Sequence, residues 1–289
     1  MSTNMKNQSY YGAFPQTTTS TEVDVVAEEI SRNGFFVKDG LLDREICNDL
    51  LYWSERENTQ KTSCYGAELL VRLKESNTIR IPMTKNKAFF DLVILNPWLI
   101  TLLDQLFSKT LSYYCLNQQN VILNQPESLH NQTVWHRDLP YQSGINSIPN
   151  AYSVLVTLTD FSMENGGTTL VPGTHLYGEL PSWSYIEKHK KQITCPAGSL
   201  IVFDSLLLHK AGENRSNSQR VAVNNVFTLP TFQQQISIPA ALSEAGADWV
   251  NTLTNRHRQL LGFASKSFNS EDEFLSSKVE RLASHPIAN

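Results

Sequence analysis

The sequence predicts a mainly β fold of the jelly-roll kind, with helices packed on its outside. Between about residues 111 and 230 the apolar runs are short, rich in Val, Ile, Leu and Tyr, and separated by Asn, Gly and Pro. The segments on either side instead carry apolar residues at helical spacing. Many short strands that do not alternate with long helices favour a sandwich or barrel over a parallel α/β sheet.

The N-terminal part is predicted to be a tail followed by mixed helices and strands. Residues 1–21 are polar and contain no apolar core segment, so we expect them to be disordered. Gly34 is expected to end the first helix, Asp43 to cap the second, and Pro97 to lie in the first turn of the third. The expected elements are helices at 22–33, 42–53 and 97–107, and strands at 34–38, 69–73 and 79–81.

The predicted barrel consists of about eight strands, followed by helices. The expected strands are 112–123, 133–139, 152–159, 168–172, 191–195, 199–203, 206–210 and 220–229. Residues 240–261 and 271–282 carry spaced apolar residues, as expected for helices that pack on the outside of a sheet. Because there is no internal repeat and no long linker, residues 22–289 are predicted to form one domain with its β core at about 111–230.

The composition excludes several classes of partner. The 289 residues are 40% hydrophobic and 18% charged, with a net charge of -4. Nucleic-acid binding relies on basic patches, so this charge gives no case for a nucleic-acid partner. The four cysteines are scattered, which predicts free thiols. With no signal peptide and no apolar run that could span a bilayer, we expect a cytoplasmic protein without a membrane partner. The sequence makes no prediction of oligomeric state.

Two candidate metal ligands lie two positions apart in the chain. Side chains at this spacing share one face of an extended strand, so His136 and Asp138 are expected to project together. His209 ends the apolar run 206–208, where an inward-facing imidazole needs a partner such as a shared metal. Two imidazoles and one carboxylate form the ligand set of non-haem Fe(II) oxygenases. Zinc accepts the same ligands with a bound water, which would give a hydrolase instead.

Arg220 is a candidate anion-binding residue. It opens the predicted strand 220–229, which follows His209 closely enough to lie beside it in an antiparallel sheet. A buried guanidinium is costly unless it meets an anion, and its planar fork suits a carboxylate. The alternative is an ion pair on the surface.

Four segments in a fixed order carry a resemblance to a known family. They are Trp135-His-Arg-Asp-Leu-Pro140, Met163-Glu-Asn-Gly-Gly-Thr-Thr-Leu-Val-Pro-Gly-Thr-His175, Cys195-Pro-Ala-Gly-Ser-Leu-Ile-Val-Phe-Asp204, and His209-Lys-Ala-Gly-Glu-Asn214 followed by Arg220. In this order they resemble the phytanoyl-CoA dioxygenase-like (PhyH) branch of the Fe(II)/2-oxoglutarate-dependent oxygenases. That family has an asparagine-glycine turn and a Pro-Gly-Ser/Thr-His segment between its metal ligands.

The resemblance implies a double-stranded β-helix, the cupin-like form of the jelly roll. It implies that His136, Asp138 and His209 hold Fe(II) and that Arg220 pairs with the distal carboxylate of the cosubstrate 2-oxoglutarate. Gln119 resembles a polar residue that some members use near the cosubstrate. A Ser or Thr that relatives often have two positions after the distal histidine is Ala211 here. Its hydrogen bond to the cosubstrate is therefore expected to be either missing or supplied by Thr168 or Thr169, with Thr168 the main candidate.

The resemblance also implies the class of reaction. Dioxygen is the second cosubstrate, 2-oxoglutarate leaves as succinate and carbon dioxide, and a C–H bond of the substrate is hydroxylated. Desaturation, epoxidation and ring formation are alternatives at the same site. Asp138 argues against halogenation, because halogenases of this type lack the carboxylate ligand.

The predicted substrate is a small molecule, in specialised natural-product metabolism. Trp135, Tyr141 and Trp183 are candidates to line the substrate mouth, where aromatic rings give large rigid contact surfaces. For Trp135 a core position is an equal alternative, because it alternates with the ligand face. A zinc hydrolase and a binding protein that has lost catalysis are the competing interpretations of the whole chain.

Overall fold

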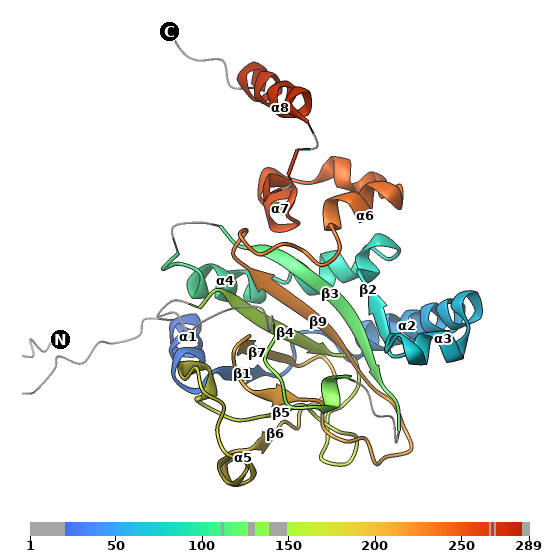
Figure 1. Ribbon diagram of the computed structural model, residues 1–289, viewed down its shortest axis with the longest axis vertical. Coiled ribbons are helices and arrows are strands. Elements are labelled where there is room, and N and C mark those ends of the chain that lie inside the picture. The colour runs from blue at the N-terminus through green and yellow to red at the C-terminus, as the bar shows by residue number, and fades with distance from the viewer. Residues whose placement is uncertain are drawn as a thin grey trace, which may run out of the picture.

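The computed structural model describes residues 21–110, 113–126, 131–138, 149–265, 267–268 and 270–284 (Figure 1). The prediction of disorder for residues 1–21 falls almost entirely outside these ranges. Within them the chain is mainly antiparallel β with flanking helices, which confirms the predicted fold class. Among the described residues, no helix is both long enough and apolar enough to cross a lipid bilayer.

Two antiparallel sheets form the centre of the molecule. The large sheet has the order β1-β7-β4-β9-β3-β2, and the small sheet has the order β6-β5-β8. The strands of the large sheet are β1 (Phe35–Lys38), β2 (Thr78–Arg80), β3 (Cys115–Asn124), β4 (Ala151–Thr157), β7 (Leu200–Asp204) and β9 (Arg220–Thr228). Those of the small sheet are β5 (Thr169–Leu170), β6 (Lys191–Gln192) and β8 (His209–Lys210). Each predicted barrel strand except 133–139 overlaps one of these strands.

The two faces of the large sheet have different partners. On one face, Val121, Val154, Val202 and Val223 pack with helices α1 (Glu22–Asn33) and α4 (Pro97–Leu106) in the main hydrophobic core. On the other face, Phe203, Ile201 and Ala222 pack with Leu170 of the small sheet. This second face is the inner face of the barrel, and it carries the candidate site.

The N-terminal helices follow the sequence predictions, with one error. Helix α1 has the predicted bounds, a capping box between Thr21 and Asp24, and Gly34 at its C-terminal end with φ 89°. Helix α2 (Arg44–Tyr65) is longer than predicted, and Asp43 precedes it without a side-chain capping bond. The prediction of a strand at 69–73 is wrong, because Ala67–Arg72 forms helix α3. Only Leu70 of that helix is buried, so the segment lacks the alternating buried residues that would pack a strand into a sheet.

Short helical turns complete the connections between the strands. They are the 3-10 helices Pro82–Thr84, Asn131–Thr133 and Thr174–Leu176, the π-helix Phe89–Ile94, and α5 (Trp183–His189).

The C-terminal segment is more broken than predicted. Instead of one helix over 240–261 it contains α6 (Ile238–Glu244), a 3-10 helix (Asp248–Thr252) and α7 (Asn255–Leu260), followed by a 3-10 helix (Phe263–Ser265). Gly246, with φ 63°, interrupts the helical path between the first two. Leu242 and Leu260 anchor α6 and α7 to the main core. Helix α8 (Glu271–Ser284) covers the predicted 271–282 and stands apart from the body in Figure 1.

Candidate metal centre

The structure brings the three candidate ligands together. One ligand atom of each of His136, Asp138 and His209 lies within 4.8 Å of the others. Asp138 Oδ1 is 3.8 Å from the Nε2 atoms of both histidines. The two imidazole rings have centroids 4.3 Å apart. Two nitrogens and one oxygen therefore converge on one point at the inner face of the barrel.

Backbone pairing between two segments far apart in the chain creates this convergence. His136 N–H donates to His209 O (2.9 Å), and His209 N–H donates to His136 O (3.0 Å). Asp138 N–H donates to Ser205 O at 2.8 Å. The predicted strand at 133–139 is thus an isolated bridge, not a full strand, and residue 139 lies outside the described ranges. The predicted alternation still holds, because both ligands face the same side.

Each histidine is oriented by its second ring nitrogen. Nδ1 of His136 lies 2.7 Å from Val134 O, and Nδ1 of His209 lies 2.9 Å from Leu207 O. A carbonyl only accepts, so each Nδ1 carries the proton, and the lone pair is left on Nε2, which faces the cluster. Burial lowers the pKa of His209, which favours the neutral imidazole that a metal requires.

The Asp138 carboxylate is oriented by Ser153, whose hydroxyl also contacts Ser205. Ser153 Oγ donates to Asp138 Oδ2 at 2.5 Å, and Ser205 Oγ lies 2.9 Å from Ser153 Oγ. This arrangement occupies one carboxylate oxygen and leaves Oδ1 directed at the histidines. Neither serine was predicted from the sequence. The sequence pattern could have indicated Ser153, because it is an inward-facing polar residue on a strand whose outward residues are apolar.

A pocket opens beside the three ligands and reaches Arg220. Its apolar lining includes Ile122, Leu155 and Phe203, and its polar lining includes Thr168 and Arg220. Gln132 and Asn224 also line it and were not predicted. Gln132 lies four positions before the first ligand, outside the motif on which the prediction relied.

The guanidinium of Arg220 is a buried cation. The residue is 4% exposed, its Nε has no hydrogen-bond partner, and its Cζ lies 4.6 Å from the centroid of the Phe161 ring. Burial lowers its pKa to about 10, so it is still charged at neutral pH. No carboxylate of the described residues forms an ion pair with it. The alternative of a surface ion pair is therefore excluded, and among the described residues this positive charge in the pocket has no carboxylate partner.

Gln119 is not brought to this pocket. Its side chain lies on the opposite face of β3, where it donates to Phe89 O and Asn225 Oδ1 and accepts from Met83 N–H. A bulge in β3 between Leu116 and Gln118 sets which residues face inward. Thr168, in contrast, lines the pocket and is 3% exposed.

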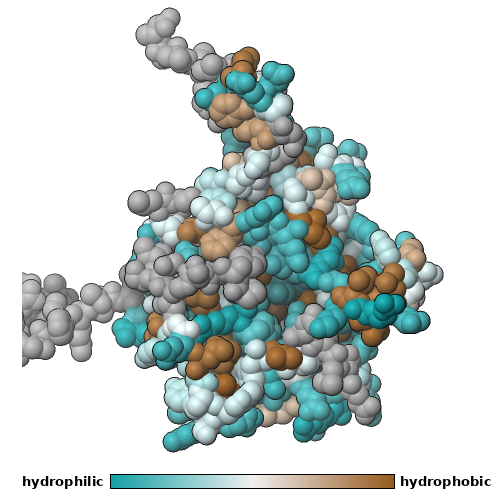
Figure 2. All heavy atoms as spheres, viewed as in Figure 1, coloured by the Kyte–Doolittle hydropathy of each residue, from teal (hydrophilic) through white to brown (hydrophobic). Residues whose placement is uncertain are grey.

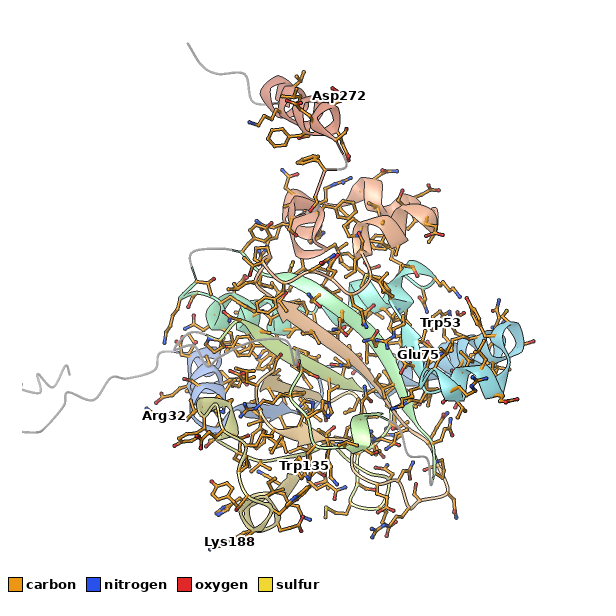
Figure 3. All side chains as sticks on the ribbon, in the orientation of Figure 1. Arg32, Trp53, Glu75, Trp135, Lys188 and Asp272 are labelled. Carbon is orange, nitrogen blue, oxygen red and sulfur yellow. The ribbon has the colours of Figure 1, made fainter. Side chains whose placement is uncertain are left out.

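Of the aromatic candidates for the substrate mouth, neither of the two in the described ranges, Trp135 and Trp183, lines this pocket. Trp135 packs against Ile186 and Leu208 on the outer side of the small sheet (Figure 3), as its core alternative predicted. Trp183 begins α5 and is 68% exposed, away from the pocket lining. Tyr141 lies outside the described residues.

The residues at the centre fit Fe(II) and a keto-acid cosubstrate. Two imidazole nitrogens and one carboxylate oxygen are the donors of non-haem Fe(II) sites that keep open positions for substrate. The buried, unpaired Arg220 lies in the same pocket and supplies the charge that a dicarboxylate needs.

Comparison with protein families gives an independent result. The sequence profile of the phytanoyl-CoA dioxygenase (PhyH) family matches residues 30–222. The uncharacterized protein Rv1501 of Mycobacterium tuberculosis is 29% identical over 268 residues, which cover 91% of this chain and 95% of that protein. A dioxygenase of Aspergillus terreus, trt7, is 27% identical over 235 residues, covering 78% and 79% of the two chains.

Solved structures share the fold. The α-ketoglutarate-dependent non-haem epimerase SnoN from nogalamycin biosynthesis superposes with a TM-score of 0.56 at 18% identity, over 72% of this chain and 83% of that one. AviO1 from Streptomyces viridochromogenes gives a TM-score of 0.55 at 18% identity, over 74% and 97% of the two chains.

Proposed function

The chain belongs to the phytanoyl-CoA dioxygenase family and is an Fe(II)/2-oxoglutarate-dependent dioxygenase, and from this premise we propose that it hydroxylates a C–H bond of a small molecule. The proposed metal ligands are His136, Asp138 and His209, because their donor atoms converge. Bound iron, with 2-oxoglutarate and dioxygen, supplies the oxidising power for an unreactive C–H bond, and 2-oxoglutarate is converted to succinate and carbon dioxide.

Arg220 is the residue that supports 2-oxoglutarate as the cosubstrate. A buried guanidinium without a counter-ion is costly to the folded state, and a carboxylate that enters the pocket removes this cost. In the proposal, Arg220 binds the distal carboxylate of 2-oxoglutarate through its planar fork. Thr168, in the same lining, offers a hydroxyl to the cosubstrate. The structure gives no support to the predicted role of Gln119.

Other residues of the chain hold the reacting groups in place. The carbonyls of Val134 and Leu207 fix the two imidazole rings, and Ser153 fixes the Asp138 carboxylate. Ile122, Leu155 and Phe203 line the same pocket and exclude water beside the ligands. Exclusion of water strengthens the Arg220 interaction and protects an oxidising site from side reactions.

Family membership decides between the competing interpretations of the chain. A zinc hydrolase would need neither a keto acid nor Arg220, and a binding protein would not need a complete ligand set. The Asp138 ligand again favours oxygen transfer over halogenation. Desaturation, epoxidation and ring formation stay open as outcomes at the same site. A substrate from natural-product metabolism is supported by the structural similarity to SnoN, an epimerase from nogalamycin biosynthesis.

The test is conversion of 2-oxoglutarate to succinate by the purified protein with added Fe(II). Slow turnover without substrate is expected, and replacing Asp138 by Ala should abolish it while the circular dichroism spectrum is unchanged. Arg220→Ala should raise the 2-oxoglutarate concentration needed for half-maximal turnover at least about tenfold, because a charge-assisted contact worth more than about 1.4 kcal/mol is lost. Absence of turnover in the wild type, together with zinc-dependent hydrolysis, would contradict the proposal.

A further inference from the structure

One cross-strand row of side chains runs across the inner face of the large sheet. Arg80 on β2 pairs with Asn120 on β3, which pairs with Asn224 on β9. Asn224 pairs with Leu155 on β4, and the row continues through Ile201 on β7. Residues in register point to the same face and touch their neighbours. The row is therefore polar from β2 to β9 and apolar from β4 onward.

This row crosses the candidate pocket at Asn224. Both Asn224 and Leu155 line the pocket with the metal ligands. Oδ1 of Asn224 is buried and has no hydrogen-bond partner, which costs free energy until a donor reaches it. The neighbouring Asn120 is 5% exposed, and its Nδ2 donates to Gln118 Oε1 at 3.3 Å. Asn224 thus brings an unsatisfied amide oxygen to the pocket, and Asn120 extends the polar row from it toward β2.

The charge at the outer end of the row is neutralised. Arg80 donates to both carboxylate oxygens of Glu75, at 2.5 and 3.1 Å, and to Gln235 Oε1 at 3.3 Å. Glu75 lies at the edge of the large sheet in Figure 3. Figure 2 shows hydrophilic side chains around a hollow near the middle of the face of the molecule that is in view. A bidentate pair of this kind leaves little net charge for an ionic ligand. The row is polar but neutral.

The row is separated from the proposed cosubstrate anchor. Arg220 pairs with Asn124, four positions along both strands from the Asn120 and Asn224 pair. Four residues of extended strand span about 13 Å. From Asn224 the polar half leads sideways to β3 and β2, away from Arg220. A ligand along this half is therefore a second molecule in the pocket, distinct from the acid that Arg220 holds.

We propose that the Asn120 and Asn224 amides bind hydroxyl groups of an uncharged substrate, while Leu155 contacts its hydrocarbon side. An amide offers both a hydrogen-bond donor and an acceptor, and so does a hydroxyl group. Hydroxyl groups can therefore pair with both the N–H groups and the oxygens of these amides. A carbonyl or a carboxylate would leave Asn224 Oδ1 unpaired. This inference rests on the proposed function and adds a substrate class to it. The substrate is a neutral compound that already carries hydroxyl groups along one edge.

The test uses the full chain loaded with Fe(II) and 2-oxoglutarate without oxygen, and detects weak ligands by saturation-transfer NMR. The probes are methyl glucoside, inositol and cyclohexanediol, their O-methylated counterparts, and hexanoyl-CoA as a charged acyl thioester. At least one hydroxylated ring should bind about tenfold tighter than its methylated form, the ratio expected for one lost hydrogen bond to a buried amide. Asn224→Leu should remove this preference.

A matched control keeps the experiment specific. Gln125→Leu removes an exposed amide at the end of β3, outside the pocket, and should keep the preference for hydroxylated rings. If Asn224→Leu does not fold, as judged by circular dichroism, Asn224→Ala and Asn120→Ala replace it.

Several results would overturn the inference. These are equal binding of methylated rings, tighter binding of hexanoyl-CoA, or no binding of any hydroxylated ring. A loss of 2-oxoglutarate affinity in Asn224→Leu that exceeds its loss of ring affinity would assign the row to the cosubstrate and also overturn it. Succinate formation without substrate tests the proposed function separately, because it does not depend on these rings.

Discussion

At the scale of single residues, the contact between Ser153 and Asp138 controls how the candidate site presents its carboxylate. The hydroxyl holds Oδ2 at 2.5 Å and so directs Oδ1 at the two Nε2 atoms. Replacing Ser153 by Ala should weaken Fe(II) binding about 10- to 100-fold, as is typical when a ligand loses its supporting hydrogen bond. Anaerobic titration with Co(II), followed by its visible absorption, measures this affinity.

Ser205 provides the matched control for this prediction. Its hydroxyl contacts Ser153 and not the Asp138 carboxylate, so Ser205→Ala should weaken metal binding clearly less than Ser153→Ala does. Equal affinities in Ser153→Ala and in the wild type would show that backbone pairing alone orients Asp138.

Asp204 gives a second prediction, on pH. Burial raises the pKa of its carboxyl from 3.8 to about 6, although Leu206 N–H donates to it. The folded state therefore binds the proton more tightly than the unfolded state, and this contribution to stability is lost as the pH rises from about 4 through 6. The shift corresponds to about 3 kcal/mol.

Asp204→Asn is the direct measurement, because the amide mimics the protonated acid and its oxygen can still accept from Leu206. In urea unfolding, the variant should be more stable than the wild type at pH 7.5 and equal to it near pH 4. A variant that is less stable at pH 7.5 would mean that the attraction between Asp204 and Arg137 outweighs the burial cost.

At the scale of elements, Arg137 joins the ligand segment to the 3-10 helix Thr174–Leu176. Its guanidinium donates to the carbonyls of Thr174, Tyr177 and Gly178 at 2.9, 2.7 and 3.2 Å. Thr174 Oγ1 in turn accepts from Leu208 N–H at 2.9 Å, next to the third ligand. This turn therefore connects both ligand-bearing segments, which explains why the residue between His136 and Asp138 is an arginine.

Arg137→Gln should weaken Co(II) binding about tenfold and shift the Co(II) absorption, because the two segments lose a common support. Arg137→Lys, which keeps the charge and can donate to one or two of the carbonyls, should recover part of the loss. A fall in melting temperature with an unchanged Co(II) spectrum would indicate a purely structural role.

Sequence patterns predicted some elements well because their determinants are local. The bounds of α1 follow from Thr21, Asp24 and Gly34, which lie within or next to the helix. The inward face of β3 does not follow from local pattern, since Gln118, Gln119 and Asn120 are all polar and a bulge decides which of them faces the pocket. The proximity of His136 and His209 was predictable only because a metal site with His136 and Asp138 needs a third ligand. Its bridge geometry depends on segments more than seventy positions apart.

At the scale of the whole molecule, one hydrophobic core joins the large sheet to helices α1, α2, α4, α6 and α7. Val26 of α1, Val223 of β9 and Leu260 of α7 all belong to it. A second cluster joins the small sheet to the other face of the large sheet. We infer from this packing that the barrel and the helices that contact it belong to one domain. The prediction for 22–289 also includes α8, and none of the described residues of α8 belongs to this core. Stability and function are therefore coupled, because a strained group in the pocket destabilises the whole domain.

Arg220 is where this coupling should be measurable. Without an anion, its buried guanidinium reduces the free energy of unfolding, and the Phe161 ring offsets part of this cost. Replacing an uncompensated buried charge by an apolar side chain of similar length is expected to stabilise the domain by about 1–3 kcal/mol. Arg220→Met should therefore melt at a higher temperature than the wild type when 2-oxoglutarate is absent.

Addition of the cosubstrate should reverse this order. In the wild type with Fe(II), 2-oxoglutarate at about 100 times its Kd adds about 2.7 kcal/mol, because only the folded state binds it. Arg220→Met should lose most of this gain. Arg215→Met, which removes an exposed arginine paired with Glu213, should keep both the wild-type melting temperature and the response to 2-oxoglutarate. If Arg220→Met instead melts lower without cosubstrate, the guanidinium has a partner within the protein, and the pocket does not hold an unpaired charge for a dicarboxylate.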